Sequence, residues 1–97
     1  MLHPIQYSFS APMWQHPGGW CFLSLPPEMA TEIREALKWQ EEGWGRLKAR
    51  ARIGSTEWET AIWFDTRLTT YLLPVKADIR KKENLKPGAV VAVFIFV

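Results

Sequence analysis

The chain has little cysteine, histidine or net charge, and each shortage excludes a class of protein. Its only thiol is Cys21, so no internal disulfide can form, and a reducing compartment such as the cytoplasm is expected. The two histidines, His3 and His16, leave too few soft ligands for a structural metal site. The net charge of +2 permits a polyanionic partner but does not demand one.

Long apolar segments are also missing. The longest apolar run, residues 89–97, is far shorter than the roughly 20 residues that cross a bilayer as a helix. The first ten residues, MLHPIQYSFS, have no basic segment followed by an apolar stretch, so they do not resemble a signal peptide. We therefore expect a cytoplasmic protein that does not contact a membrane.

Aromatic residues, in contrast, are abundant. They make up 13% of the 97 residues and include six tryptophans. Burying one tryptophan removes on the order of 200 Å² of surface from water, so a few of them supply much of the core of one small domain. The sequence therefore predicts a single folded domain over residues 1–97.

Hydrophobic periodicity predicts a mainly β chain. Outside the hairpin described next, the expected strands are residues 5–11, 20–25, 70–73 and 89–97. The last of these is apolar on both faces, which predicts a central strand covered on both sides. Helical spacing of apolar residues predicts two short helices, over about 27–40 and 75–85.

The clearest pattern is a hairpin centred on Gly54-Ser55, a pair that suits a two-residue type II′ turn. Basic and apolar residues alternate before the turn, and acidic and apolar residues follow it. The register set by this turn pairs Arg46 with Trp63, Leu47 with Ile62, Arg50 with Glu59, Ala51 with Trp58, and Arg52 with Glu57. A shift by one residue would mix the two faces, so Glu57 and Glu59 are expected to face arginines rather than act as paired catalytic acids.

About six strands in under a hundred residues favour a small β-barrel, closed or partly open, with two short helices. Closure removes exposed strand edges, which is why short strands in such number favour it. Only the helix over 27–40 is long enough to serve as a parallel crossover.

Three segments resemble the signature segments of DUF1905, a bacterial family of unknown function: GGWCFLSLP, WGRLKARARIGSTEWETAIW and YLLPVKADIRKKENLKPGAVVAV. The most specific pieces are Trp44-Gly45, Ile53-Gly54, and residues 73–76 followed by Ile79-Arg80. The likeness runs from about Phe9 to the C-terminus. The resemblance implies a small β-barrel with helical excursions, and it implies no reaction.

No residue pattern indicates catalysis. Cys21 lies among apolar neighbours, so a buried and inert thiol is expected. The serines lack the glycines of a nucleophile elbow, and the glycine pairs lack the helix and lysine of a phosphate-binding loop. No catalytic residue, metal or cofactor is predicted, and an unrecognised enzyme is the least favoured interpretation.

Two surfaces are candidates for binding. The first is a basic cluster around the second helix, to which Arg67 can contribute: Lys76, Arg80, Lys81, Lys82 and Lys86. It either binds phosphates or is a solvated helix face. The second is aromatic and consists of Trp63, with Arg46 opposite it and Trp14 and Trp44 as neighbours. It either binds a partner or packs at the end of the barrel.

The favoured function is a non-catalytic binding or assembly module that uses this aromatic-basic surface for a protein partner or a small ligand. The alternative is a nucleic-acid-binding barrel that uses the basic helix over 75–86. The candidate binding residues are Trp63, Arg46, Trp44, Lys76, Arg80 and Arg67. Because Trp63 must point outward, we expect it to be covered by a ligand or by a second copy of the chain in a homodimer.

Overall fold

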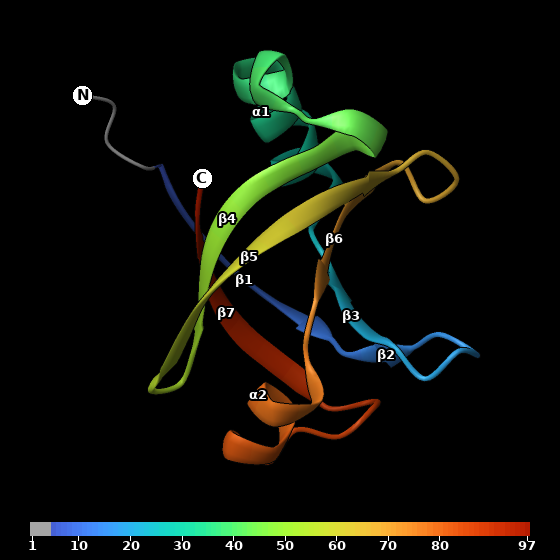
Figure 1. Cartoon of the computed structure of the whole chain (residues 1–97), viewed down its shortest axis with the longest axis vertical. Coiled ribbons are helices and arrows are strands. Elements are labelled where there is room, and N and C mark those ends of the chain that lie inside the picture. The colour runs from blue at the N-terminus through green and yellow to red at the C-terminus, as the bar shows by residue number, and fades with distance from the viewer. Residues whose placement is uncertain (1–4) are drawn as a thin grey trace.

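The computed structural model describes residues 5–97, so His3 lies outside the part described. One antiparallel sheet of seven strands curls strongly into a half-barrel (Figure 1). The strands are β1 (Gln6–Pro12), β2 (Trp14–Gln15), β3 (Cys21–Ser24), β4 (Arg46–Ile53), β5 (Thr56–Asp65), β6 (Thr70–Pro74) and β7 (Val90–Phe96). The helices are α1 (Pro27–Leu37), α2 (Ala77–Lys82) and two short 3₁₀ segments, η1 (Lys38–Gln40) and η2 (Gly43–Gly45).

The two edges of the sheet are joined by the chain itself. The strand order is β1-β7-β4-β5-β6-β3-β2, and only Met13 separates β1 from β2. The N–H of Met13 donates to the carbonyl of Ala89, and its own carbonyl accepts the N–H of Gly88. The predicted partly open barrel is therefore confirmed. The seventh strand, β2, was not predicted, because two residues are too few to show the alternation of apolar and polar residues that is typical of a strand.

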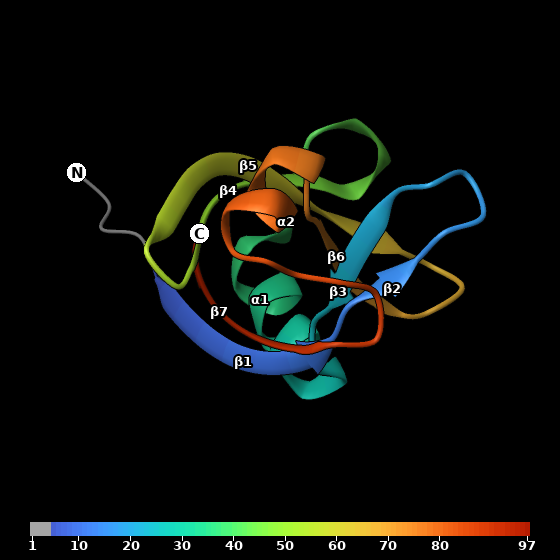
Figure 2. The ribbon, with the colours of Figure 1, turned by 90° about the horizontal axis from the view of Figure 1, so that it is seen from below.

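The helices lie at opposite ends of the half-barrel and cover its core. Figure 1 shows α1 at one end and α2 at the other, and Figure 2, seen from below, shows both within the ring of strands. Helix α1 buries Ala30, Ile33 and Leu37, while α2 buries Ile79. No helix within residues 5–97 is long and apolar enough to cross a membrane.

The predicted first helix is confirmed, because α1 and η1 together cover residues 27–40. This helix joins β3 to β4, which are not neighbours in the sheet, so it makes no parallel crossover. The predicted second helix over 75–85 is shorter in the structure, covering only residues 77–82. Asn84 has φ of 54°, a left-handed conformation that cannot continue a helix.

The β4–β5 hairpin has the predicted register in every pair, from Ile53 opposite Thr56 to Arg46 opposite Trp63. Gly54 has the positive φ, 58°, that a type II′ turn requires at its first position. The arginines and glutamates face one another as predicted. The ion pair that forms is diagonal, however, with Arg50 Nε 3.2 Å from Glu57 Oε2.

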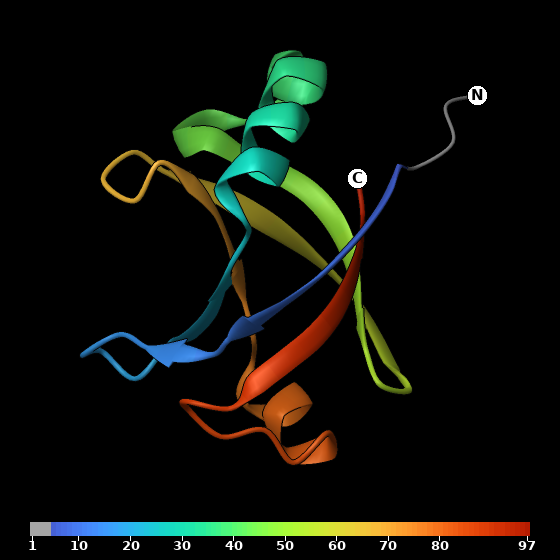
Figure 3. The same ribbon diagram turned by 180° about the vertical axis from the view of Figure 1, so that it is seen from behind.

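The last strand, β7, is central as predicted, lying between β1 and β4 (Figure 3). The prediction that β7 is covered on both sides is wrong, because its outer-face residues are exposed or only partly buried. The guanidinium groups of Arg50 and Arg52 lie instead over the rings of Phe96 and Phe94, each 4.6 Å from the ring centroid. Hydrophobic periodicity cannot distinguish a ring covered by a helix from one covered by an arginine side chain.

Candidate functional site

An aromatic hollow of about 420 Å³ lies on the outer face of the half-barrel, over β3, β5 and β6. Most of its lining consists of aromatic residues, namely Trp20, Phe22, Trp44, Trp63 and Phe64, although the ring of Phe64 packs inward against Tyr71. Leu72 and Pro74 of β6 complete the apolar part of the lining, and Asp65 is its charged residue. We call this feature the aromatic hollow.

Trp44 reaches the aromatic hollow from the tip of a small closed loop. The backbone N–H of Glu42 donates to the carbonyl of Arg46 over 2.6 Å, and the reverse bond is 3.3 Å. Within this loop Trp44 has φ of 67° and ψ of 24°, and its side chain is 91% exposed. A left-handed conformation costs a non-glycine residue about 1–2 kcal/mol, and burial of this indole does not repay that cost.

The loop is seated against β5 by its glycine. Gly45 has φ of 71°, and a Cβ added there would lie 3.1 Å from the Cβ of Phe64. A larger residue would push the loop away from β5. Gly45 therefore holds the segment that carries Trp44 close to the other rings of the hollow.

Trp20 enters the hollow from a second tight turn. The N–H of His16 donates to the carbonyl of Trp20 over 2.7 Å, and the N–H of Gly18 donates to His16 Nδ1 over 3.2 Å. The imidazole of His16 thus takes part in the turn that positions Trp20. Trp20 is 62% exposed, so the prediction that it belongs to a buried strand is wrong for this residue.

The alternation of β3 explains the position of Trp20. Cys21 and Leu23 point into the core, which places Trp20, Phe22 and Ser24 on the other face. The polar Ser24 was the available signal that this face is not buried. Because Trp20 and Phe22 on the same face are apolar, the segment nevertheless resembles a strand that is buried on both faces.

Trp63 points outward beside Arg46, as predicted, and is 39% exposed. The guanidinium carbon of Arg46 lies 5.7 Å from the centroid of the Trp63 indole, and Arg46 also forms an ion pair with Glu42. Trp14, expected near Trp63, does not line the hollow. It packs against Phe22 with ring centroids 5.0 Å apart and so supports that ring from one side.

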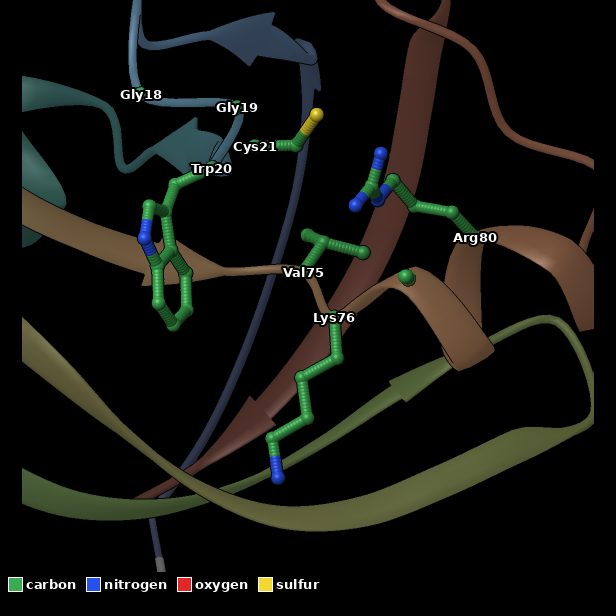
Figure 4. Close-up of a pocket in the computed structure, with 8 residues that line it drawn as sticks. Gly18, Gly19, Trp20, Cys21, Val75, Lys76 and Arg80 are labelled. Carbon is green, nitrogen blue, oxygen red and sulfur yellow. The ribbon is translucent and has the colours of Figure 1, made fainter.

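A second hollow, of about 380 Å³, adjoins the first at Trp20 (Figure 4). One side is the segment from Gly18 to Cys21, and the other consists of Val75, Lys76, Ala77 and Arg80. We call this feature the basic hollow. Trp20 lines both hollows. The aromatic surface and the basic surface, which the sequence predicts as two separate candidates, are therefore neighbours in the fold.

The two cations of the basic hollow lie differently. Figure 4 shows the Lys76 side chain and the Trp20 indole extending to the same side, while the guanidinium of Arg80 turns toward Cys21. Cys21 is buried, as predicted. Arg80 Nε is also buried and has no hydrogen-bond partner within residues 5–97.

Neither Lys76 nor Arg80 is neutralised by an acidic side chain in the described part of the chain. The ion pairs found there are Arg34–Glu41, Arg46–Glu42 and Arg50–Glu57. The basic hollow therefore carries uncompensated positive charge. Charge of this kind beside an aromatic ring attracts anions.

Arg67, predicted to lie near the basic helix, lies elsewhere. It belongs to the β5–β6 loop at the α1 end of the sheet, whereas Lys76 and Arg80 lie at the α2 end (Figure 1). Its backbone N–H donates to Asp65 Oδ1 over 2.9 Å, as does that of Leu68. Arg67 lines neither hollow, and Asp65 is engaged in holding this loop.

A polar cluster beneath α1 anchors the segment that leads to Trp44. The hydroxyl of Tyr71 donates to Glu41 Oε2, and Arg34 Nε lies 3.7 Å from the same oxygen. The Arg34 guanidinium also lies 3.7 Å from the centroid of the Phe64 ring. Burial first, and then the Glu41 carboxylate, raise the pKa of Tyr71 far above its ordinary value of 10.0. This cluster could not be predicted from the sequence, because Tyr71 lies 30 residues from Glu41 in the chain.

The lining residues offer rings for stacking and cations for binding an anion. Across residues 5–97, no three His, Cys, Asp or Glu side chains gather in a way that could hold a metal ion. The two hollows thus provide flat aromatic faces and positive charge.

The sequence profile of the domain of unknown function DUF1905 matches residues 9–95. The chain belongs to the DUF1905 family. The match covers nearly the whole chain and confirms the resemblance seen in its signature segments. No curated protein matches this DUF1905 domain.

Proposed function

We propose that this DUF1905 domain is a non-catalytic binding module and that a small ligand occupies the aromatic hollow. The observation that carries the proposal is Trp44. Its backbone adopts a costly left-handed conformation, and its indole is nevertheless almost fully exposed. Strain that the fold itself does not use is typical of a functional residue.

The surroundings of Trp44 support the same proposal. Trp20 and Trp63 come from other segments of the chain and are also exposed, so apolar surface that normally would be buried gathers at one place. The volume of the aromatic hollow, about 420 Å³, lies within the range of about 300–1,000 Å³ found for small-molecule sites. A concave shape suits a small molecule better than a flat protein partner.

The proposal includes a cytoplasmic location. It is supported by the single cysteine, which can form no internal disulfide and lies buried in the core.

The experiment is a titration followed by the side-chain indole N–H signals of the tryptophans in nuclear magnetic resonance spectra. The probes are indole, benzoate and adenosine, with glucose as the probe that lacks a flat aromatic ring. We expect the ring compounds to shift the signals of Trp20, Trp44 and Trp63 but not that of Trp39. Trp39 is the matched control, because it is 74% exposed yet lines neither hollow.

The variants Trp44→Ala and Trp39→Ala complete the test. Trp44→Ala is expected to weaken or abolish the shifts of Trp20 and Trp63, whereas Trp39→Ala is expected to leave them unchanged. Shifts that gather at Trp39, or no shift with any ring compound, would contradict the proposal.

A further inference from the structure

The aromatic hollow and the basic hollow meet at Trp20, and this junction indicates the chemistry of the ligand. Building on the proposed function, we infer that the ligand joins a flat ring to one anionic group, as a mononucleotide does. The ring lies in the aromatic hollow against Trp20 and Trp44. The anionic group lies in the basic hollow near Lys76, whose side chain extends to the same side as the Trp20 indole (Figure 4).

The aromatic hollow favours a ring over an extended peptide. Peptides are commonly bound by adding a strand to an open sheet edge, where backbone groups are unpaired. The strands beneath this hollow are paired with one another, β5 with β6 and β6 with β3. A ligand must therefore be held by side-chain faces, and the faces present are aromatic rings, on which a flat ring stacks.

The basic hollow favours an anion. Lys76 and Arg80 line it, and neither is paired with an acidic side chain within residues 5–97. Lys76 and the Trp20 indole extend to the same side (Figure 4), so one molecule can contact both.

The distribution of charge favours one anionic group over a nucleic-acid strand. A single strand needs cations along the whole path of its backbone, beside the rings on which its bases stack. The aromatic hollow has no lysine or arginine in its lining, and its charged residue is the acidic Asp65. Arg46, next to Trp63, is already paired with Glu42. Of the two hollows, only the basic one is lined by cations that could bind a phosphate.

The test compares three probes. Ribose 5-phosphate has the anionic group without the flat ring, adenosine has the ring without the anionic group, and adenosine monophosphate has both. Amide and indole shifts are followed for the whole protein. Adenosine monophosphate is expected to shift signals in both hollows and to bind most tightly. Adenosine is expected to shift only signals of residues that line the aromatic hollow, and ribose 5-phosphate only signals of residues that line the basic hollow.

Two variants distinguish direct binding by Lys76 from a general effect of the protein's positive charge. Lys76→Gln is expected to weaken adenosine monophosphate about tenfold, the loss typical of one charge-assisted hydrogen bond, and to leave adenosine unaffected. Lys82→Gln removes the same charge from an exposed residue outside both hollows and is expected to change neither affinity.

The outcomes also separate this inference from the proposed function. If adenosine binds as tightly as adenosine monophosphate and Lys76→Gln changes neither, the anionic part is overturned while ring binding in the aromatic hollow stands. If a four-nucleotide strand binds far more tightly, with affinity that falls steeply with salt, the ligand is a strand and the inference is overturned. If none of the three probes shifts either hollow, the inference is overturned, and indole and benzoate still test the aromatic hollow independently.

Discussion

Arg46 and Trp63 face each other across β4 and β5, with the guanidinium carbon 5.7 Å from the centroid of the indole ring. Arg46 also closes the loop that carries Trp44, through its backbone bonds to Glu42. One residue thus contacts both a tryptophan of the sheet and the base of the Trp44 loop. The positions of these two rings in the aromatic hollow are physically linked.

Trp63→Ala is expected to remove one wall of the aromatic hollow while the fold survives. The expected loss of unfolding free energy is about 1–2 kcal/mol, because a cation–π pair at an exposed site contributes about 0.5–1 kcal/mol and the indole is partly buried. Thermal melting checks the stability, and light scattering checks the oligomeric state. Trp39→Ala serves as the control for loss of an exposed indole.

Light scattering also distinguishes the two expected ways in which Trp63 is covered, by a ligand or by a second copy of the chain. Under the proposed function, wild type and Trp63→Ala have the same mass in solution. A wild-type dimer that dissociates in the variant would assign this surface to a second copy of the chain. A loss of several kcal/mol from a monomer would mean that Trp63 acts mainly in the core.

Tyr71 predicts a loss of stability in alkali. Its pKa in the folded chain lies far above the ordinary 10.0, because of burial and of the neighbouring Glu41. Above about pH 10 the unfolded chain loses the phenolic proton while the folded chain keeps it, so unfolding becomes more favourable as pH rises. Urea unfolding at pH 8 and at pH above about 10 measures this slope.

Tyr71→Phe is expected to reduce the alkaline slope and to lower stability at neutral pH by about 1–3 kcal/mol, since Glu41 loses its hydrogen-bond donor. Tyr7→Phe is the comparison, because burial and Glu32 also raise the pKa of Tyr7. Tyr7 is less buried, so its substitution should flatten the slope less. Equal slopes in wild type and Tyr71→Phe would contradict the assignment.

Gly54 is predicted to be required at the tip of the β4–β5 hairpin. A Cβ there would overlap Glu83 Oε1. The other carboxylate oxygen of Glu83, Oε2, accepts the hydroxyl hydrogen of Thr56 over 2.5 Å. Gly54→Ala is expected to cost about 1–2 kcal/mol through the left-handed backbone and the displaced Glu83. Gly43→Ala is the control, because its Cβ meets no atom within 4 Å, and it should change stability by less than about 0.5 kcal/mol. Equal costs for the two variants would show that Glu83 does not constrain the turn.

The hairpin could be predicted from the sequence because everything that fixes it is local. The two-residue turn, the alternation and the matching charges lie within twenty residues, and each would be disturbed by a slip of register. Trp63 was placed outward beside Arg46 by the same reasoning. The fold class followed from the number and length of the strands.

The junction of the two hollows could not be predicted because it depends on contacts between distant segments. Trp20 and Lys76 line the same hollow because β3 pairs with β6, a pairing that the sequence does not specify. Charge alone places Arg67 with the basic helix, but in the fold β6 lies between its loop and that helix. An apolar residue such as Trp20 is equally consistent with a core position and with an exposed one until its neighbours in space are known.

Trp44 allows stability and binding to be separated in one substitution. Asparagine adopts the left-handed conformation more readily than tryptophan, and it adds no backbone freedom of the kind that glycine brings. Because the Trp44 indole is 91% exposed, Trp44→Asn sacrifices little burial. We therefore expect the variant to be as stable as wild type or more stable by about 1 kcal/mol, and to bind adenosine or indole far more weakly. Urea unfolding and the titration of Trp20 and Trp63 signals measure the two effects on the same sample. A Trp44→Asn protein that loses more than about 1 kcal/mol of stability would mean that this indole supports the fold, and the strain at Trp44 would then no longer argue for a ligand.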